Sequence, residues 1–151
     1  LWDRVRVHGG AYGSGNSFDF FTGDYSLLSY RDPNLTETLE IYDEIADFLN
    51  HLELPSEELT KIIIGCVGKM DPPLTPDLKG KASMIDHLTG RTHEMKQKIR
   101  EELLSTRLGD LKDYAPLFKK IRDGGHVCAL GNEDKLKKSK SVFSQLVKVF
   151  N

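Results

Sequence analysis

The sequence predicts an α+β protein in which helices pack on one face of an antiparallel sheet. A glycine-rich run near the start and, after a turn, the stretch Tyr25–Tyr30 with its two-residue alternation indicate the sheet. From residue 34 onward, apolar side chains recur at helical spacing in one segment after another. Strands and helices that occur in separate runs are typical of the α+β class.

The chain is expected to begin with the last turns of a helix, residues 1–7, that leads into a glycine-rich strand. Four glycines surround Tyr12 in this strand: Gly9, Gly10, Gly13 and Gly15. Glycine allows another main chain to approach closely, so the run suggests a surface where main chain meets main chain. Residues 22–24, Thr-Gly-Asp, supply a turn, and the two strands are therefore predicted to form a hairpin.

Helices are predicted directly after the hairpin. Asn34 is expected to cap the first of them, with Glu37 three residues later as in a capping box. The buried stripe of this helix is expected to run from residue 35 to residue 52. Residues 55–56, Pro-Ser, are expected to end this helix and to cap the next, whose buried stripe reaches Met70.

Prolines then interrupt the chain, and shorter helices follow. Residues 71–76 contain three prolines, which exclude helix and predict a rigid connector. Further helices are predicted over residues 77–88, after a cap at Thr92, and over residues 110–122. Within the last of these, Pro116 either kinks the helix or marks a later start.

The end of the chain is predicted to add a third strand and two helices. Residues 126–130 form a short apolar run typical of a strand, and a polar helix follows that ends near Lys138. Ser141 is expected to cap the last helix, with four side chains facing inward: Val142, Leu146, Val149 and Phe150. Three strands make a narrow sheet, so strands that precede residue 1 in the parent protein are expected to complete it.

Composition excludes several classes of function. The net charge of −2 and the lack of a face rich in Lys or Arg argue against nucleic acid as a partner. The basic run at residues 135–140 is interpreted as a solvated helix end. No apolar run approaches the roughly 18 residues of a membrane span, so no membrane partner is expected. Cys66 and Cys128 each lie in an apolar run and are predicted to be buried free thiols.

No metal or phosphate site is predicted within the chain. The zinc-binding motif H-x-x-E-H is absent, and His87 and His93 are six residues apart, which misses the spacing that places two ligands on one helix face. The run G-A-Y-G-S-G at residues 10–15 follows a helix and lacks the lysine of a phosphate-binding loop. The histidines are interpreted as ordinary polar or structural residues.

Two motifs resemble a known family. The run R-V-H-G-G-A-Y-G begins at Arg6, and S-Y-R-D-P-N ends at Asn34. Both are similar to the C-terminal region of the pitrilysin/insulinase-type metallopeptidases, within them most to the presequence protease and falcilysin group. The resemblance implies a large clamshell enzyme of four related α+β domains with zinc in the first. Residues 1–151 would then be the C-terminal part of the fourth domain, a single domain or half-domain.

The resemblance also implies roles for the first motif. In related enzymes an arginine and a tyrosine at the positions of Arg6 and Tyr12 reach across a closed chamber to the substrate. A phenol hydroxyl can donate to the oxyanion of a tetrahedral intermediate, and a guanidinium can fork onto a carbonyl or carboxylate. Tyr12 is therefore the expected catalytic residue, with substrate-binding groups at Arg6, Gly9, Gly10 and Ala11. The alternative is that Tyr12 only packs on the sheet and that Arg6 pairs with Asp3 or Glu37.

The whole protein is accordingly expected to be a zinc metalloendopeptidase of unstructured peptides, in a mitochondrion or plastid. Its zinc would be bound outside this segment, and its partners would be the peptide substrate and the N-terminal half of the same polypeptide. The segment alone is expected to be inactive. The alternative is a non-catalytic relative that binds peptides or a partner subunit.

Overall fold

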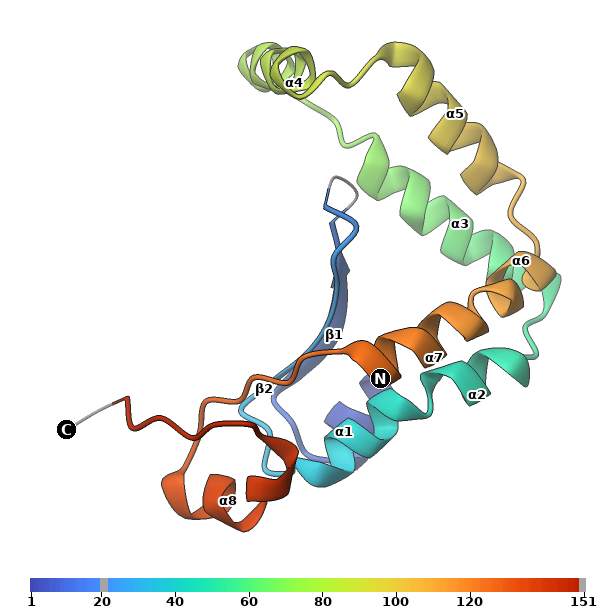
Figure 1. Cartoon of the computed structure of the whole chain (residues 1–151). Helices are drawn as coiled ribbons and strands as arrows, with labels where there is room; N and C mark the ends of the chain where they lie inside the picture. Colours follow the sequence, from blue (N-terminus) through green and yellow to red (C-terminus); the bar gives the residue numbers. More distant parts are fainter. Residues whose placement is uncertain (20–21, 150–151) are drawn as a thin grey trace. The chain divides into compact units, whose positions relative to one another are not determined.

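The computed structural model describes residues 1–19 and 22–149, and it divides the chain into two compact units (Figure 1). One unit consists of Leu1–Asn50 with Ala115–Asn151, and the other of His51–Tyr114. The first unit contains the two strands, and the described part of the second contains only helices. The predicted α+β class is therefore confirmed. The assignment of the chain to one domain or half-domain stays a prediction.

The first unit begins with the helix η1, Trp2–His8, which is a π-helix, and continues into the predicted hairpin. Strand β1, Gly13–Phe18, pairs antiparallel with strand β2, Tyr25–Tyr30, in the register that places Gly13 opposite Tyr30. At the turn, Gly23 has a φ of +76°, which glycine adopts without strain, and its N–H donates to the carbonyl of Asp19 at 2.8 Å.

The described part of the first unit contains four α-helices, of which α1, α2 and α7 are in contact with one another. The four are α1, Thr36–Asp43; α2, Ile45–Asn50; α7, Ala115–Gly124; and α8, Glu133–Lys138. Helices α2 and α7 lie side by side, and each buries an alanine, Ala46 and Ala115 (Figure 1). The ring of Phe118 in α7 meets that of Tyr25 edge to face at 5.1 Å. This ring pair connects α7 to the hairpin.

Helix α1 is attached to the sheet through Tyr42. Its hydroxyl is buried beside the hydroxyls of Ser14 and Ser29, which are partners in the strand register. Burial raises the pKa of Tyr42 above its ordinary value, because the ionised form would lose its contact with water.

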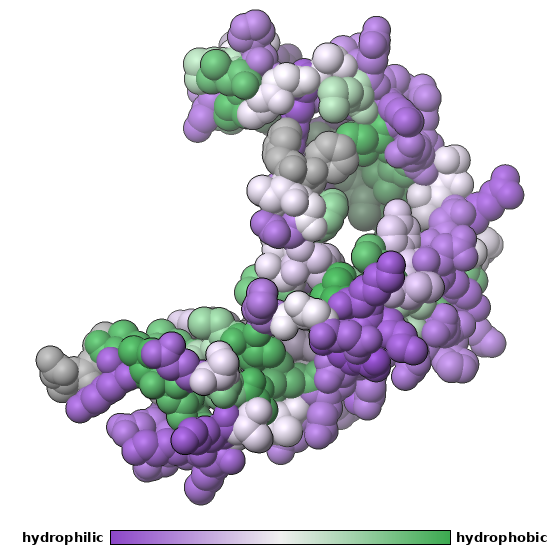
Figure 2. All heavy atoms as spheres, viewed as in Figure 1, coloured by the Kyte–Doolittle hydropathy of each residue, from purple (hydrophilic) through white to green (hydrophobic). Residues whose placement is uncertain are grey.

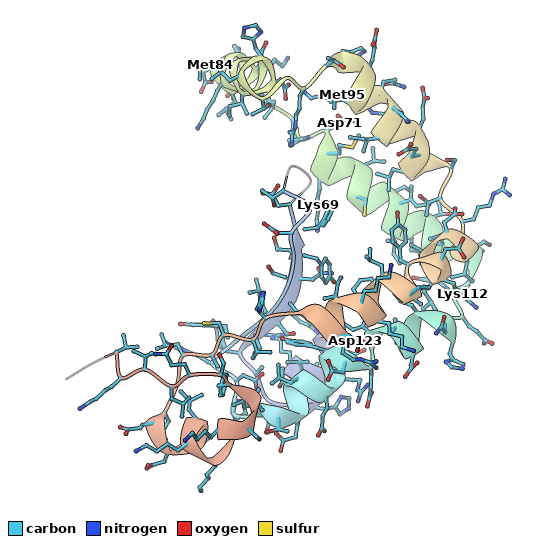
Figure 3. All side chains as sticks on the ribbon, viewed as in Figure 1. Lys69, Asp71, Met84, Met95, Lys112 and Asp123 are labelled. Atoms are coloured by element: carbon cyan, nitrogen blue, oxygen red, sulfur yellow. The ribbon has the colours of Figure 1, made fainter. Side chains whose placement is uncertain are left out.

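The second unit is a series of four helices. They are α3, Ser56–Met70; α4, Pro76–Thr89; α5, His93–Leu104; and α6, Leu108–Asp113. Helices α3 and α5 are in contact, and Arg100 of α5 forks onto Asp71, the residue just after α3 (Figure 3), with nitrogen to oxygen distances of 2.7 to 3.0 Å. The Arg100 guanidinium holds the pKa of Asp71 below its ordinary value.

Most of the predicted element boundaries in this unit are confirmed. Helix α4 begins at Pro76, so the predicted exclusion of helix over residues 71–76 is wrong at its last residue; in the first turn the missing N–H of proline costs nothing. Thr92 caps α5 by accepting from the N–H of Met95 at 3.1 Å. The predicted helix over residues 110–122 is divided at Tyr114, so Pro116 marks a later start, in the first turn of α7. At α3, Ser56 is the first helical residue and Pro55 holds the cap position, so the predicted Ser56 cap is wrong.

Three predictions for the end of the chain and the thiols are wrong. Residues 126–130 form no strand, and the sheet of the described residues has only two strands. Ser141 lies within a single 3-10 turn, Lys140–Val142, and residues 143–149 are irregular; Phe150 lies outside the described residues. Cys66 and Cys128 are free thiols as predicted but are exposed. An apolar run is buried only where another element covers it, and here none does.

Few side chains are fully enclosed. The buried apolar residues of the described chain are Val5, Ala11, Ala46 and Ala115, whereas apolar side chains of the predicted stripes remain exposed, among them Ile62 at 51% and Leu88 at 74%. Figure 2 shows apolar side chains at the surface of both units. Among the described residues, none of the helices combines the length and the apolar character that crossing a membrane requires.

Asn34 does not cap α1, contrary to the prediction. The cap position belongs to Leu35, and the Asn34 side-chain amide donates to the carbonyl of Gly9 at 2.6 Å. The N–H of Asn34 in turn donates to Asp32 at 2.9 Å, and the second carboxylate oxygen of Asp32 accepts from the buried Thr38 hydroxyl at 2.7 Å. Asp32 and Asn34 therefore connect the end of η1 to the start of α1.

The role of Asn34 can be tested with Asn34→Asp. Aspartate caps helices as well as asparagine does, but it cannot donate, and a carboxylate at this position would face the Gly9 carbonyl. We expect the variant to lose about 1–3 kcal/mol in the free energy of unfolding, measured by chemical denaturation. Asn132→Asp is the matched control, because Asn132 does cap its helix, α8, by accepting two N–H groups, and it should lose almost nothing. Equal stability of both variants would contradict the assignment.

Candidate functional site

An open pocket of about 360 Å³ lies in the first unit where η1 meets the hairpin. Its lining residues are Arg6, Val7, Gly10, Ala11, Tyr12 and Arg31. Four of the five residues that the sequence singled out as a site therefore share one pocket, and the fifth, Gly9, adjoins it along the chain. The structure adds Arg31, to which the sequence assigned no chemical role.

The pocket is built on a tight exit from η1. Three successive N–H groups turn back to the helix. Gly9 donates to the carbonyl of Arg4 at 2.9 Å, Gly10 to that of Arg6 at 3.1 Å, and Ala11 to that of Val5 at 3.2 Å. The last of these bonds ends on the carbonyl of Val5, whose side chain is completely buried. The three N–H groups of the motif are thus consumed within the turn.

Two positions in this turn require glycine. A Cβ on Gly9 would lie 2.6 Å from the carbonyl oxygen of Val5, closer than real contacts allow. Gly10 has a φ of +79°, in the left-handed region that other residues rarely adopt. The glycines that suggested main-chain contact therefore bring the exit of η1 against its own last turn.

Arg6 is oriented by two contacts. Its Nε donates to the carbonyl oxygen of Tyr12 at 3.0 Å, and its guanidinium carbon lies 4.1 Å from the centre of the Trp2 ring. The alternative pairing with Asp3 or Glu37 is absent from the ion pairs of the described residues; the neighbouring Arg4 pairs with Glu44 instead. Because only Nε is used, the terminal amino groups of Arg6 are available to a ligand.

Tyr12 is held by its backbone while its side chain is exposed. Its N–H donates to the carbonyl of Tyr30 at 3.1 Å, which extends the strand ladder by one residue beyond Gly13. The Tyr12 ring meets the Tyr30 ring edge to face at 6.0 Å, and 66% of the residue remains accessible. In the described part of the chain its hydroxyl forms no hydrogen bond, so the group is free to donate to a ligand.

Arg31 is the residue that sequence reasoning missed. Its backbone has a φ of +49°, and its guanidinium carbon lies 5.7 Å from the Tyr12 ring and 5.4 Å from the Tyr30 ring. Arg31 and its neighbour Asp32 form no ion pair among those of the described residues. The strand register was the available signal: if Gly13 faces Tyr30, the residues just beyond them, 12 and 31, must be neighbours.

The histidines play no part in this pocket. The ring Nδ1 of His8 lies 2.8 Å from the carbonyl oxygen of Asp3 in the same helix. His87 and His93 lie in the second unit, where they line a pocket with three basic residues, Lys79, Arg91 and Lys96, and one carboxylate, Asp86, which pairs with Lys96. The described residues contain no cluster of three His, Cys, Asp or Glu that could hold a metal. The described side chains therefore do not fit a zinc ion.

Comparison with known proteins gives one family. The family model described as "PreP C-terminal domain" matches residues 1–133. "Presequence protease 1, chloroplastic/mitochondrial" of Arabidopsis thaliana is 50% identical over 134 residues, which cover 89% of this chain and 12% of that protein. "Protein HypA" of Clostridium perfringens is 41% identical over 149 residues, covering 99% of this chain and 15% of that protein.

A fungal protein extends the comparison. "Presequence protease, mitochondrial" of Aspergillus oryzae is 32% identical over 133 residues, 88% of this chain and 13% of that protein. The chain therefore spans between 12% and 15% of the length of these three relatives. The match includes the whole pocket and ends near the start of α8.

The tight exit from η1 predicts a sharp difference between two glycines. In Gly9→Ala the new methyl group would collide with the Val5 carbonyl, which belongs to the rigid helix and cannot move aside. We expect a loss of about 1–3 kcal/mol in the free energy of unfolding, as for other overpacked sites. Gly15→Ala is the matched control, because a Cβ there meets no atom within 4 Å. Thermal or chemical denaturation of both variants checks this, and a Gly9→Ala variant as stable as Gly15→Ala would contradict the geometry.

Proposed function

Because the chain belongs to the PreP C-terminal domain family, we propose that it is part of a zinc metalloendopeptidase that degrades unstructured peptides, such as cleaved targeting peptides, in a closed chamber. In this proposal the segment supplies substrate-binding and oxyanion groups, and the zinc is bound elsewhere in the polypeptide. The observation that carries the proposal is the shared pocket of Arg6, Gly10, Ala11 and Tyr12.

Tyr12 has the geometry of an oxyanion donor. Its N–H is bound in the strand ladder and its ring is supported by Tyr30, so the position of the hydroxyl is restricted before a substrate arrives. A donor placed in advance stabilises the charge that develops on the carbonyl oxygen without reorganisation during the reaction. The exposed hydroxyl can reach a substrate that approaches from the open side of the pocket.

Arg6 has the geometry of a substrate clamp. Its Nε is bound to the Tyr12 carbonyl, which links the positions of the two functional side chains. Its terminal amino groups can fork onto a peptide carbonyl or carboxylate. Arg6 would therefore act in the ground state and in the transition state, whereas Tyr12 would act mainly in the latter.

The small residues of the motif act through shape. Gly9 uses both its N–H and its carbonyl within the fold, and the N–H groups of Gly10 and Ala11 are likewise occupied. What they offer a peptide is close approach, because Gly10 has no side chain and Ala11 is buried. In this proposal, Gly9 shapes the floor of the pocket and the next two residues border the substrate.

The rest of the polypeptide is the proposed partner. The hairpin has two strands and exposes large apolar side chains, among them Phe18 at 61% and Leu28 at 55%. Exposed apolar groups on a two-stranded sheet support the proposal that further strands or helices of the same protein cover them. The names of the plant and fungal relatives support a mitochondrion or plastid as the location of the protein.

The role of Tyr12 can be tested with Tyr12→Phe in the full-length protein. Loss of one oxyanion donor typically lowers turnover by roughly 10²–10³-fold, while the ring still packs on Tyr30. We expect kcat to fall far more than KM rises, with an unchanged melting temperature. Tyr30→Phe is the matched control, since Tyr30 is 59% exposed against 66% for Tyr12 but does not line the pocket, and it should keep near-normal kcat. Near-normal kcat in Tyr12→Phe would show that this residue only packs on the sheet.

Arg6→Ala should differ from Tyr12→Phe by raising KM as well as lowering kcat, because the Arg6 guanidinium would also bind the substrate in the ground state.

The 151-residue chain by itself should have no peptidase activity. A catalytic zinc needs three protein ligands, and no such cluster is present in the residues that the structure describes. We expect the purified chain to leave an unstructured fluorogenic peptide intact and to contain no stoichiometric zinc by metal analysis. Stoichiometric zinc together with chelator-sensitive cleavage would overturn this part of the proposal.

A further inference from the structure

The pocket of Tyr12 contains two guanidinium groups and no carboxylate. Arg6 and Arg31 line it, and its other lining residues are uncharged. The acidic side chain next in sequence to Arg31 is Asp32, but both of its oxygens are engaged, one by the N–H of Asn34 and the other by the hydroxyl of Thr38. The pocket therefore concentrates positive charge in a chain whose net charge is −2.

Arg31 is held at the pocket by its backbone and by two aromatic rings. It is the one non-glycine residue with positive φ in the described chain, and such a conformation persists only where surrounding structure imposes it. Here the hairpin ends at Tyr30, and the Arg31 guanidinium lies within 6 Å of the rings of Tyr12 and Tyr30. Such contacts favour the cation and limit the positions that it samples.

The two guanidinium groups retain most of their donors. Arg6 uses only Nε, and Arg31 forms no hydrogen bond or ion pair among the described residues. The two guanidinium groups that line the pocket repel each other, and a neutral ligand does not relieve this repulsion. A carboxylate relieves it and accepts two N–H groups from one guanidinium in the fork geometry.

We propose that this pocket is a carboxylate-binding subsite for peptides and that Arg31 is the residue that selects the charge. The inference rests on the proposed peptidase function and specifies its substrate class. The carboxylate is either an acidic side chain of the peptide or its free C-terminus, which have the same chemistry. Arg31 acts through electrostatic pairing with the substrate, whereas Tyr12 acts on the reacting carbonyl.

The experiment uses the full-length protein and matched reporter peptides. A single Glu is moved along an otherwise uncharged, unstructured sequence, each peptide has a Gln counterpart, and each is made as C-terminal acid and amide. We expect the wild type to favour a carboxylate at one position by about five- to tenfold in kcat/KM, and this ratio to shrink as salt is raised. A preference for Glu in both acid and amide series identifies a side chain, and a preference for acid over amide alone identifies the C-terminus.

Variants of Arg31 then assign the selectivity. Arg31→Gln should bring the ratio close to one, and Arg31→Lys should leave it intermediate because the charge stays but the fork is lost. Arg31→Asn is a second neutral variant that tolerates the left-handed backbone, which keeps the test valid if the Gln variant does not fold. Arg4→Gln is the matched control, since Arg4 lies on η1 two residues before Arg6, pairs with Glu44 and does not line the pocket.

The outcomes separate this inference from the proposed function. A wild type that does not distinguish charge in any peptide pair, or a ratio that Arg31→Gln leaves unchanged, overturns the subsite. If Arg31→Gln lowers kcat/KM by the same factor for all peptides, the subsite is also overturned, since Arg31 would then only support the Tyr12 ring. Tyr12→Phe should lower kcat for all peptides and leave the charge ratio intact. If the full-length protein cleaves none of them, the ratio of Kd values for Glu and Gln peptides, by fluorescence anisotropy, carries the same test.

Discussion

The contact of the Gly9 backbone with the last turn of η1 is the constraint on which the site depends. Only a residue without Cβ can pass the Val5 carbonyl at this distance. Once the chain has passed it, the N–H of Ala11 bonds back to Val5, and the N–H of Tyr12 donates to the carbonyl of Tyr30, just before the strand pair of Gly13 and Tyr30. A helix is thereby converted into a strand within four residues, and the positions of the functional side chains follow from that conversion.

Three segments of the first unit stabilise the exit from η1. Asn34, from the start of the helical region, donates to the Gly9 carbonyl, and Arg6 donates to the Tyr12 carbonyl from the helix side. The hairpin contributes the third support through the edge-to-face pair of Tyr12 and Tyr30. Because each support uses a different chemical group, loss of one weakens the arrangement without removing the other two. Rigid placement of this kind is what the roles proposed for Tyr12 and Arg6 require.

The sparse core explains why local bonds matter so much in this chain. Among the described residues, Val5 is the largest side chain that is completely enclosed. Individual elements are instead connected by polar links such as the fork of Arg100 onto Asp71 and the chain from Thr38 through Asp32 to Asn34. An exposed ion pair such as Arg100 with Asp71 contributes little stability by itself and mainly orients the two helices.

Local sequence patterns predicted most of the secondary structure, because caps, turns and periodicity are decided by neighbouring residues; the candidate site came instead from the resemblance of the run that begins at Arg6 to a family motif. The hairpin and the Thr92 cap were predicted in this way, and a later helix start at Pro116 was one of two alternatives. Burial could not be predicted from local patterns, since a pattern shows which face is apolar but not whether another element covers it; Cys66 and Cys128 were placed wrongly for that reason. Tertiary structure alone decided that the Asn34 amide binds Gly9, 25 residues away, instead of capping its own helix. It also decided that Arg31 joins Arg6 and Tyr12, because the pairing register of two strands brings together residues that no local rule connects.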